Sequence, residues 1–113
     1  PKYKPKPKAV TRLQKHKNKD KFLNRFNVVD PDGCCHTIVA HIAMDGHYYI
    51  YPTPNPTIEN ARSITVREAA RIQSFPDDYF FEGSRTAAFR QIGNAVPVMM
   101  SYNIALSLLN QLE

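Results

Sequence analysis

The charge of this chain is unevenly distributed, and this limits which residues can build a folded core. Residues 1–25 hold ten Lys or Arg and one acid, Asp20, a net of +9; subtracting this from the whole-chain +5 leaves −4 for residues 26–113. The basic segment alternates Lys with Pro and lacks periodic hydrophobic residues, so it cannot bury enough apolar surface to offset the entropy of ordering. We expect an extended or disordered arm at residues 1–21 and a folded part that begins near Phe22.

The basic arm suits a phosphate-rich partner, because Lys and Arg that neutralise phosphates release counterions and give salt-dependent affinity without sequence preference. Lys15 and Lys17 are candidate contacts of this kind. The alternative is a solvated linker, since a run of like charges is weak evidence by itself.

Length and cysteine usage indicate a single small intracellular domain. The 113 residues contain no run of about 18 apolar residues, and no apolar stretch follows the N-terminal lysines, so neither a transmembrane helix nor a secretory signal is expected. Cys34 and Cys35 are adjacent and have no other cysteine to pair with, which fits a reducing compartment better than a disulfide scaffold.

Residues 35–51 show the alternation of a β-hairpin. In CHTIVAHIA, successive side chains would point to opposite faces of a strand, with Thr37, Val39 and His41 on one face and Ile38, Ala40 and Ile42 on the other. Met44-Asp45-Gly46 would supply the turn before the return strand HYYIY. Residues 52–61 hold three prolines and two asparagines, which predicts a loop.

A capping box predicts a helix that starts after Thr65. The Thr65 hydroxyl can accept from the amide of Glu68, whose side chain can reach back, and Phe75-Pro76 must end the helix. Its small and apolar residues are expected to pack inward, namely Ala69, Ala70 and Ile72. Its longer polar side chains are expected to point elsewhere, namely Arg67, Arg71 and Gln73.

Two further helices complete a predicted α+β fold. One can start at Ser84 and stop at Gly93, a suitable C-cap residue. From Pro97 onward, apolar residues at helical spacing predict an amphipathic helix. They form one wide stripe, namely Val98, Tyr102, Ala105, Leu109 and Leu112.

Three segments resemble one protein family. RSITVREAARIQSFPDDYFF (residues 62–81) and RQIGNAVP (residues 90–97) resemble the last two signature motifs of DNA cytosine-5 methyltransferases, in the right order. HTIVAHIAMDGHYYIYP (residues 36–52) resembles the end of the target-recognition region in bacterial members. The resemblance covers roughly residues 22–112 and implies the C-terminal part of a bacterial, cytoplasmic, DNA-associated enzyme.

The resemblance also implies a domain plan. Residues 22–92 would be a small DNA-recognition domain, and residues 93–113 a helix that returns to a Rossmann-like catalytic domain absent from this sequence. Asn94 and Ala95 would approach S-adenosylmethionine, and Gly93 would line the pocket for the flipped cytosine. This is physically reasonable because glycine permits close backbone approach and a helix N-terminus offers unpaired amides to a carboxylate.

Three residues are candidates for DNA contact. Thr37 aligns with a threonine that contacts a DNA phosphate in the family, and the alternative is a strand threonine without a ligand. Arg67 and Arg71 are further candidates. Their alternatives are a solvated side chain, or for Arg67 a tie between its helix and nearby backbone or carboxylates.

The residues that methylation needs are missing. The family uses a cysteine nucleophile in a Pro-Cys dipeptide, a glutamate in Glu-Asn-Val and a glycine-rich cofactor loop, and this sequence contains none of them. We therefore assign no catalytic residue and expect no activity from the chain alone. Cys34 and Cys35 are assigned as small buried residues or loop thiols. With His36 and His41 they make a poor metal site, because three of the four are consecutive, so no metal is expected.

Two functions from different classes follow. In the first, the chain is part of an enzyme that transfers a methyl group from S-adenosylmethionine to carbon 5 of a flipped cytosine, in a restriction-modification or related system. Its partners would be double-stranded DNA and a catalytic domain, on the same protein or on a larger complementing subunit, with no membrane. The alternative is a freestanding DNA-binding or regulatory module. Such a module needs neither a cofactor-facing turn at residues 93–96 nor an exposed apolar helix.

Overall fold

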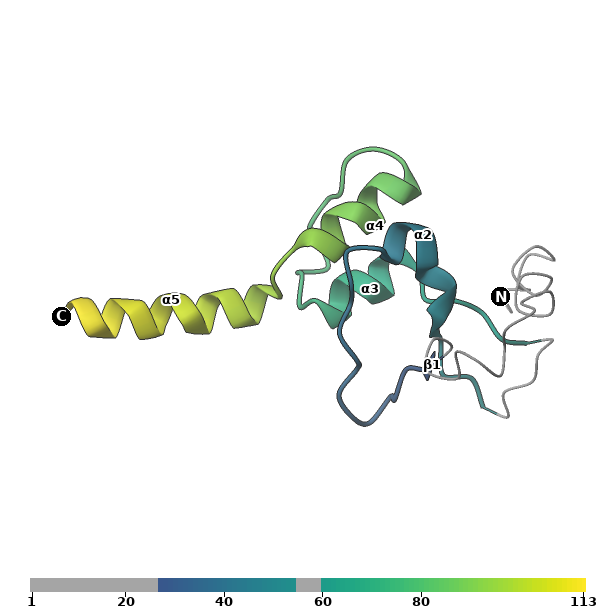
Figure 1. Cartoon of the computed structure of the whole chain (residues 1–113), viewed down its shortest axis with the longest axis horizontal. Helices are drawn as coiled ribbons and strands as arrows, with labels where there is room; N and C mark the ends of the chain where they lie inside the picture. Colours follow the sequence, from purple (N-terminus) through teal and green to yellow (C-terminus); the bar gives the residue numbers. More distant parts are fainter. Residues whose placement is uncertain (1–26, 55–59) are drawn as a thin grey trace. The chain divides into compact units, whose positions relative to one another are not determined.

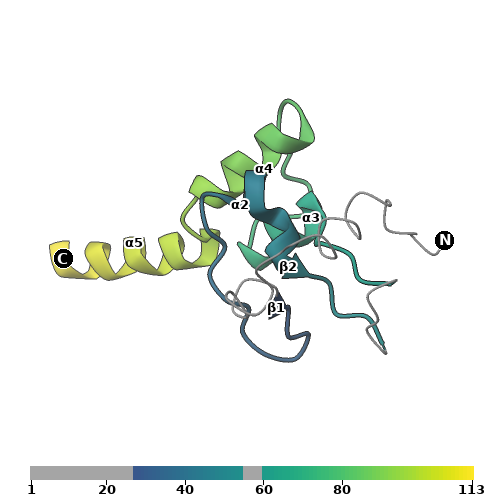
Figure 2. The same cartoon turned by 45° about the vertical axis from the view of Figure 1, so that its right-hand side comes forward.

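The computed structural model describes residues 27–54 and 60–113, so the predicted arm with Lys15 and Lys17 lies outside the described residues. The chain divides into two compact units. The described residues of the first are 27–36, 45–54 and 60–64, and the second consists of residues 37–44 and 65–113. The elements are β1 (Asn27–Val28), α2 (Ile42–Asp45), the 3-10 turn η3 (Gly46–Tyr48), β2 (Tyr49–Ile50), α3 (Val66–Ile72), α4 (Arg85–Asn94) and α5 (Val98–Leu112). All but η3 are labelled in Figure 1 or Figure 2.

The first unit is built around β2. This strand pairs in parallel with β1, with Asn27 opposite Tyr49, and the two strands lie side by side in Figure 2. On its other side the Ile64 amide donates to the Tyr49 carbonyl at 3.0 Å. Tyr49 is buried and its ring stacks on His36 at 4.7 Å between centroids. The result is a two-stranded sheet, extended by an isolated bridge, in which β2 carries the buried aromatic residue.

The β-hairpin predicted for residues 35–51 is wrong, although the α+β class is confirmed. Residues 34–39 have no regular secondary structure, α2 and η3 follow, and β2 pairs with β1 instead of the segment before it. The alternation failed because Ile38 and Ile42 are buried while Ala40 between them is exposed. At Asp45-Gly46 the chain passes from α2 directly into η3, so it makes no hairpin turn there.

In the second unit, α3 begins and ends as predicted. The Glu68 amide donates to the Thr65 hydroxyl at 3.2 Å, and the Thr65 amide donates to the Glu68 carboxylate at 2.7 Å. The helix ends at Ile72, before Phe75-Pro76. Ala69 and Ala70 are fully buried, which allows α3 to approach α4 closely.

The α4 helix starts as predicted and continues one residue further. The Ser84 hydroxyl accepts from the Ala87 amide at 3.2 Å, which confirms the N-cap. The helix runs through Gly93 to Asn94, so Gly93 lies inside its last turn and is not the C-cap residue. Its buried side chains are Ala88, Phe89 and Ile92.

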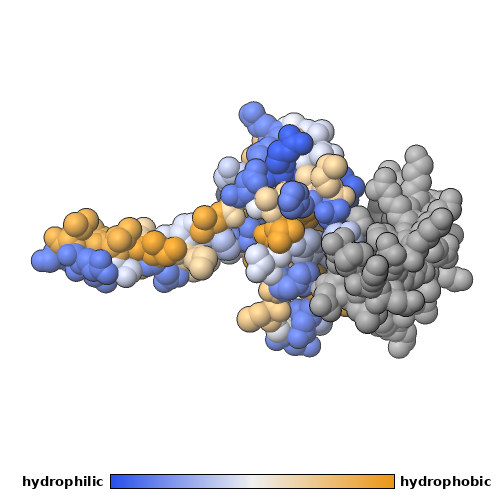
Figure 3. All heavy atoms as spheres, in the orientation of Figure 1, coloured by the Kyte–Doolittle hydropathy of each residue, from blue (hydrophilic) through white to orange (hydrophobic). Residues whose placement is uncertain are grey.

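The predicted last helix is confirmed as α5, and none of its residues is buried against any described part of the chain. Figure 3 shows apolar side chains along it. Its exposed large apolar residues are Val98, Met99, Met100, Tyr102, Ile104, Leu106, Leu108, Leu109 and Leu112.

One stretch, Arg85–Leu112, is long and apolar enough to span a membrane by length and composition. It is not one continuous helix, because residues 95–97 separate α4 from α5. The 15 residues of α5 extend about 22 Å at about 1.5 Å per residue, less than the roughly 30 Å of a hydrocarbon core.

Candidate functional site

The candidate site is the turn between α4 and α5, residues 95–97, together with Asn94 at the end of α4. It is held by the residue that follows α3: Gln73 Nε2 donates to the carbonyls of Ile92 and Ala95, both at 3.1 Å. Gln73 is only 5% exposed. The prediction that its side chain points away from the core is wrong, because the two carbonyls give a buried amide the partners that it needs.

The N-terminus of α5 is held by the same short segment. The Val98 amide donates to the Gln73 carbonyl at 3.0 Å, and the Met99 amide donates to the Ser74 hydroxyl at 2.9 Å. Ser74 has φ of 57°, in the left-handed region that residues other than glycine seldom adopt. The expectation that this helix start offers unpaired amides to a carboxylate is therefore wrong for its first two amides.

Gly93 is required by close packing of the chain on itself. A Cβ placed there would lie 2.8 Å from the Val39 carbonyl oxygen, 2.9 Å from Ile42 Cγ2 and 3.1 Å from Ala40 Cα. Distances below 3.0 Å cannot be met without movement of the neighbouring atoms. The close approach at Gly93 is made to residues 39–42 of the same chain. Contact of Gly93 with a flipped base stays a prediction.

Asn94 and Ala95 differ in what they can offer a ligand. The Ala95 amide donates to the Ile92 carbonyl at 3.2 Å, and its carbonyl accepts from Gln73. Asn94 is exposed, and its side chain makes no hydrogen bond within the described residues. A carboxamide can both donate and accept hydrogen bonds, so Asn94 is the residue of this site with a free polar side chain. Binding of S-adenosylmethionine by Asn94 and Ala95 stays a prediction.

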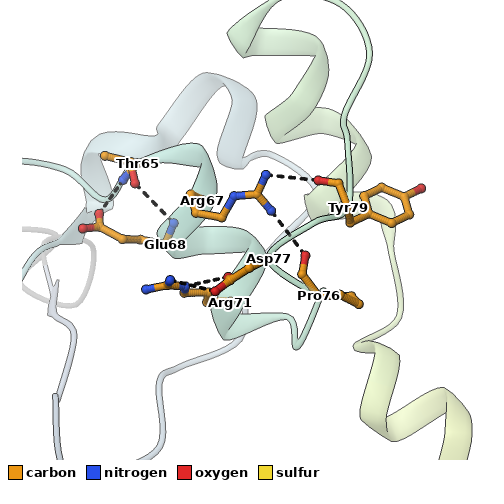
Figure 4. Close-up of polar contacts among 7 residues, drawn as sticks. All are labelled: Thr65, Arg67, Glu68, Arg71, Pro76, Asp77 and Tyr79. Carbon is orange, nitrogen blue, oxygen red and sulfur yellow. Dashed lines mark hydrogen bonds and ion pairs between the residues drawn. The ribbon is translucent and has the colours of Figure 1, made fainter.

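Arg67 holds the loop that follows α3 (Figure 4). Its Nη1 donates to the Pro76 carbonyl at 3.3 Å and its Nη2 to the Tyr79 carbonyl at 3.0 Å. Its guanidinium lies 5.9 Å from the centre of the Phe81 ring. The predicted tie to neighbouring backbone is confirmed. A DNA contact by Arg67 stays a prediction.

Arg71 is engaged by a carboxylate. Its Nε and Nη2 donate to the two oxygens of Asp77, each at 2.8 Å (Figure 4). The hydrogen bond from Arg71 lowers the pKa of the Asp77 carboxyl. The pair is largely exposed, so Arg71 remains accessible at the surface. A phosphate contact, which stays a prediction, would have to share or replace this pairing.

Thr37 is exposed in a segment without regular structure, directly before buried Ile38. The alternative of an ordinary strand threonine therefore does not apply, because no strand contains it. Phosphate contact by Thr37 stays a prediction. Its segment leads straight into residues 39–42, which pack against Gly93.

The cysteines are free thiols. Cys34 is exposed and Cys35 is half-buried, and burial raises the pKa of the Cys35 thiol. This agrees with loop thiols, since a raised pKa disfavours the thiolate that a nucleophile needs. Among residues 27–54 and 60–113, no three His, Cys, Asp or Glu side chains are grouped so that they could hold a metal ion.

Sequence reasoning missed Gln73 and Ser74. These two polar residues lie between the end of a helix and Phe75-Pro76, a position where polar side chains are usually exposed to solvent. Nothing in the nearby sequence indicates that their partners are backbone groups far along the chain. The one available signal was the need for a residue with left-handed backbone after a helix, which Ser74 fills.

Comparison with known proteins identifies the family. The profile of the C-5 cytosine-specific DNA methylases matches residues 3–110. The chain is 60% identical over 94 residues to the type II methyltransferase M.Bpa9945I of Bacillus paralicheniformis, covering 83% of this chain and 20% of that protein. It is 44% identical over 84 residues to the type II methyltransferase M.AgeI of Thalassovita gelatinovora, covering 74% of this chain and 18% of that protein.

The chain thus spans about a fifth of the length of these relatives. No solved structure matches it. Because the family profile covers nearly the whole sequence, including both segments that resemble signature motifs, the chain belongs to the C-5 cytosine-specific DNA methylase family.

Proposed function

We propose that this chain is the C-terminal, DNA-reading part of a DNA (cytosine-5)-methyltransferase of a restriction-modification or related system. The enzyme transfers a methyl group from S-adenosylmethionine to carbon 5 of a cytosine flipped out of the duplex, in the cytoplasm of a bacterial cell. The observation that carries the proposal is the family match over residues 3–110 by a chain that spans a fifth of its relatives.

The residues of this chain have defined parts in that reaction. Asn94 hydrogen-bonds the cofactor from the α4–α5 turn, with Ala95 beside it and Gly93 toward the flipped base. Thr37 contacts a DNA phosphate, which positions the duplex. The bound cofactor supplies the methyl group. The chain itself contributes binding and orientation, because its sequence lacks the Pro-Cys nucleophile and the Glu-Asn-Val motif.

The α5 helix is the surface that joins this chain to a catalytic domain. Nine large apolar side chains are exposed along 15 residues, more than a monomeric surface leaves uncovered without reason. A freestanding DNA-binding module has no use for such a helix, so this feature favours the enzyme over the regulatory alternative. The catalytic domain belongs to the same protein or to a larger complementing subunit.

A chimeric enzyme tests the proposal. The segment of M.Bpa9945I that matches this chain is replaced by the corresponding residues of this chain, and transfer of tritiated methyl groups to DNA is measured. We expect 5-methylcytosine from the chimera, a loss of about tenfold or more in kcat/KM for the cofactor with Asn94→Ala, and no transfer by the 113-residue chain alone. M.Bpa9945I with its own segment reinserted at the same junctions is the control.

The opposite result supports the alternative. A chimera without methyl transfer beside an active control, together with tight DNA binding by the isolated chain, would assign the chain to the DNA-binding modules.

A further inference from the structure

A buried carboxamide lies directly behind the turn that carries Asn94. Gln73 follows α3, is 5% exposed, and directs both donors of its Nε2 atom at main-chain carbonyls, one at the end of α4 and one in the turn. The Ile92 carbonyl also accepts from the Ala95 amide at 3.2 Å. The polar interior of the turn is therefore organised by one side chain from a different helix.

The main chain of the same segment completes the attachment. The Gln73 carbonyl accepts from Val98 and the Ser74 hydroxyl accepts from Met99. With the two side-chain bonds, four hydrogen bonds join residues 73–74 to residues 92–99. Both ends of the turn, the last residues of α4 and the first of α5, are thus fixed to the C-terminus of α3.

The position of Asn94 follows from these bonds. Asn94 lies between Ile92 and Ala95, whose carbonyls Gln73 holds, and its own side chain has no hydrogen bond within the described residues. Its direction is set by the main chain on either side. Without the donor from Gln73, the part-buried Ala95 carbonyl would lose its hydrogen-bond partner within the described residues. The turn could then reorient, because an acceptor that is shielded from water and left unpaired is costly.

We propose that Gln73 is a positioning residue: its carboxamide fixes the α4–α5 turn and so determines the direction in which Asn94 meets the cofactor. The cofactor part of this inference rests on the proposed function, whereas the ordering of the turn does not. A polar residue of the DNA-recognition part would then control affinity for a cofactor that it does not touch.

The ordering is tested by amide hydrogen exchange in the 113-residue chain. With Gln73→Met, which keeps the size of the side chain and removes its donors, we expect protection factors to fall at least tenfold at Ala95, Val98 and Met99. Protection at Ala69 and Ala88, whose amides bond within or at the start of α3 and α4, should change less than twofold. Unchanged protection in the turn, or an equal fall at all five amides, would overturn the inference.

Gln91 offers a matched control. Its Nε2 also donates to a main-chain carbonyl, that of Glu82 at 2.9 Å, but Gln91 is exposed. Gln91→Met removes the same kind of bond outside the turn, so exchange at Ala95, Val98 and Met99 should stay within twofold of the original chain. A fall equal to that of Gln73→Met would show that the effect is not specific to Gln73.

Gln73→Glu provides a titratable version of the same side chain. Burial raises the pKa of a carboxyl group, and only its protonated form can donate to a carbonyl. Protection of the three turn amides should therefore be several-fold higher at pH 5 than at pH 7 in this variant, and should show no such change in Gln73→Met. Equal pH dependence in the two variants would contradict a role for the donor.

The cofactor part is tested in the chimeric enzyme. Gln73→Met should raise KM for S-adenosylmethionine at least fivefold, with kcat and KM for DNA within twofold, and Gln91→Met should change none of them. An unchanged cofactor KM, or an equal loss for both substrates, would refute the cofactor part. A chimera that is inactive with Gln73 in place would refute the proposed function instead and leave the exchange result valid.

Discussion

The α4 and α5 helices are consecutive in the chain, and the burial of their side chains is the opposite of what their composition suggests. The α5 sequence is the more apolar, yet no residue of it is buried against a described part of the chain. The α4 sequence carries Arg85, Arg90 and Gln91 and still buries three side chains against its neighbours. Burial in these two helices is therefore decided by the presence of a partner surface, which α3 supplies to α4 and no described residue supplies to α5.

The largest expected effect comes from matched truncations in the two helices. Ile92 in α4 is fully buried, so Ile92→Ala should lower the free energy of unfolding by about 2–5 kcal/mol. Leu109 in α5 is half exposed, and Leu109→Ala should change it by less than about 0.5 kcal/mol. Urea unfolding of the 113-residue chain measures both. Similar losses at the two sites would break the comparison and show that α5 is packed in solution.

A smaller effect is expected at Gly93, where the α4 surface meets residues 39–42. Alanine is favoured over glycine inside a helix by about 1 kcal/mol, but the added Cβ would lie 2.8 Å from a carbonyl oxygen. We expect Gly93→Ala to destabilise the chain by about 1–3 kcal/mol in thermal or urea unfolding. Asn94→Ala, at the next and exposed position, is the control and should be nearly neutral. A stabilising Gly93→Ala would show that residues 39–42 do not pack there.

The start of α3 sharpens the comparison with the start of α5. Thr65 caps α3 with its own side chain, whereas the first amides of α5 depend on Gln73 and Ser74. Thr65→Ala should cost about 1 kcal/mol of stability without changing hydrogen exchange at Val98 and Met99. Thr65→Ser, which keeps the hydroxyl, is the control. Loss of protection at the start of α5 in Thr65→Ala would mean that the two helix ends melt together.

The smallest effect is expected for the exposed pair of Arg71 and Asp77. The pKa of Asp77 is lowered in the folded chain, so pairing contributes stability above the ordinary aspartate range and loses it as pH falls through the folded-state pKa. Asp77→Asn should shift the urea midpoint only slightly at pH 7 and low salt, and the shift should shrink in high salt or as the pH falls below the ordinary aspartate range. A shift that persists under both conditions would indicate a role beyond charge pairing.

Local features were predictable because their causes lie within a few residues. The capping box joins Thr65 to Glu68, three positions away, and the stop at Pro76 and the cap at Ser84 act over the same short range. The amphipathic pattern of α5 was also predictable, because its apolar residues recur at helical spacing. The resemblance of residues 62–81 and 90–97 to signature motifs led to the correct family.

Features that depend on distant partners were not predictable. Residues 35–51 show the alternation of a strand. However, Ile38 and Ile42 are buried in the second unit, whereas Tyr49 pairs with β1 in the first. The tie of Arg67 to backbone is an exception that was predicted, because its partners, the carbonyls of Pro76 and Tyr79, lie only 9 and 12 residues away in the loop that follows α3. The partners of Gln73, the carbonyls of Ile92 and Ala95, could not be predicted from its neighbours in the sequence.

By itself the sequence determined where α3, α4 and α5 begin and which family the chain belongs to. These depend on short-range hydrogen bonds, proline geometry and residue patterns, all of which can be read along the chain. Only the tertiary structure decided that Gln73 is buried and that Gly93 meets residues 39–42. The partners of Gln73 lie 19 and 22 residues away, and a side chain that bonds across such a distance is placed by packing, not by its own neighbours.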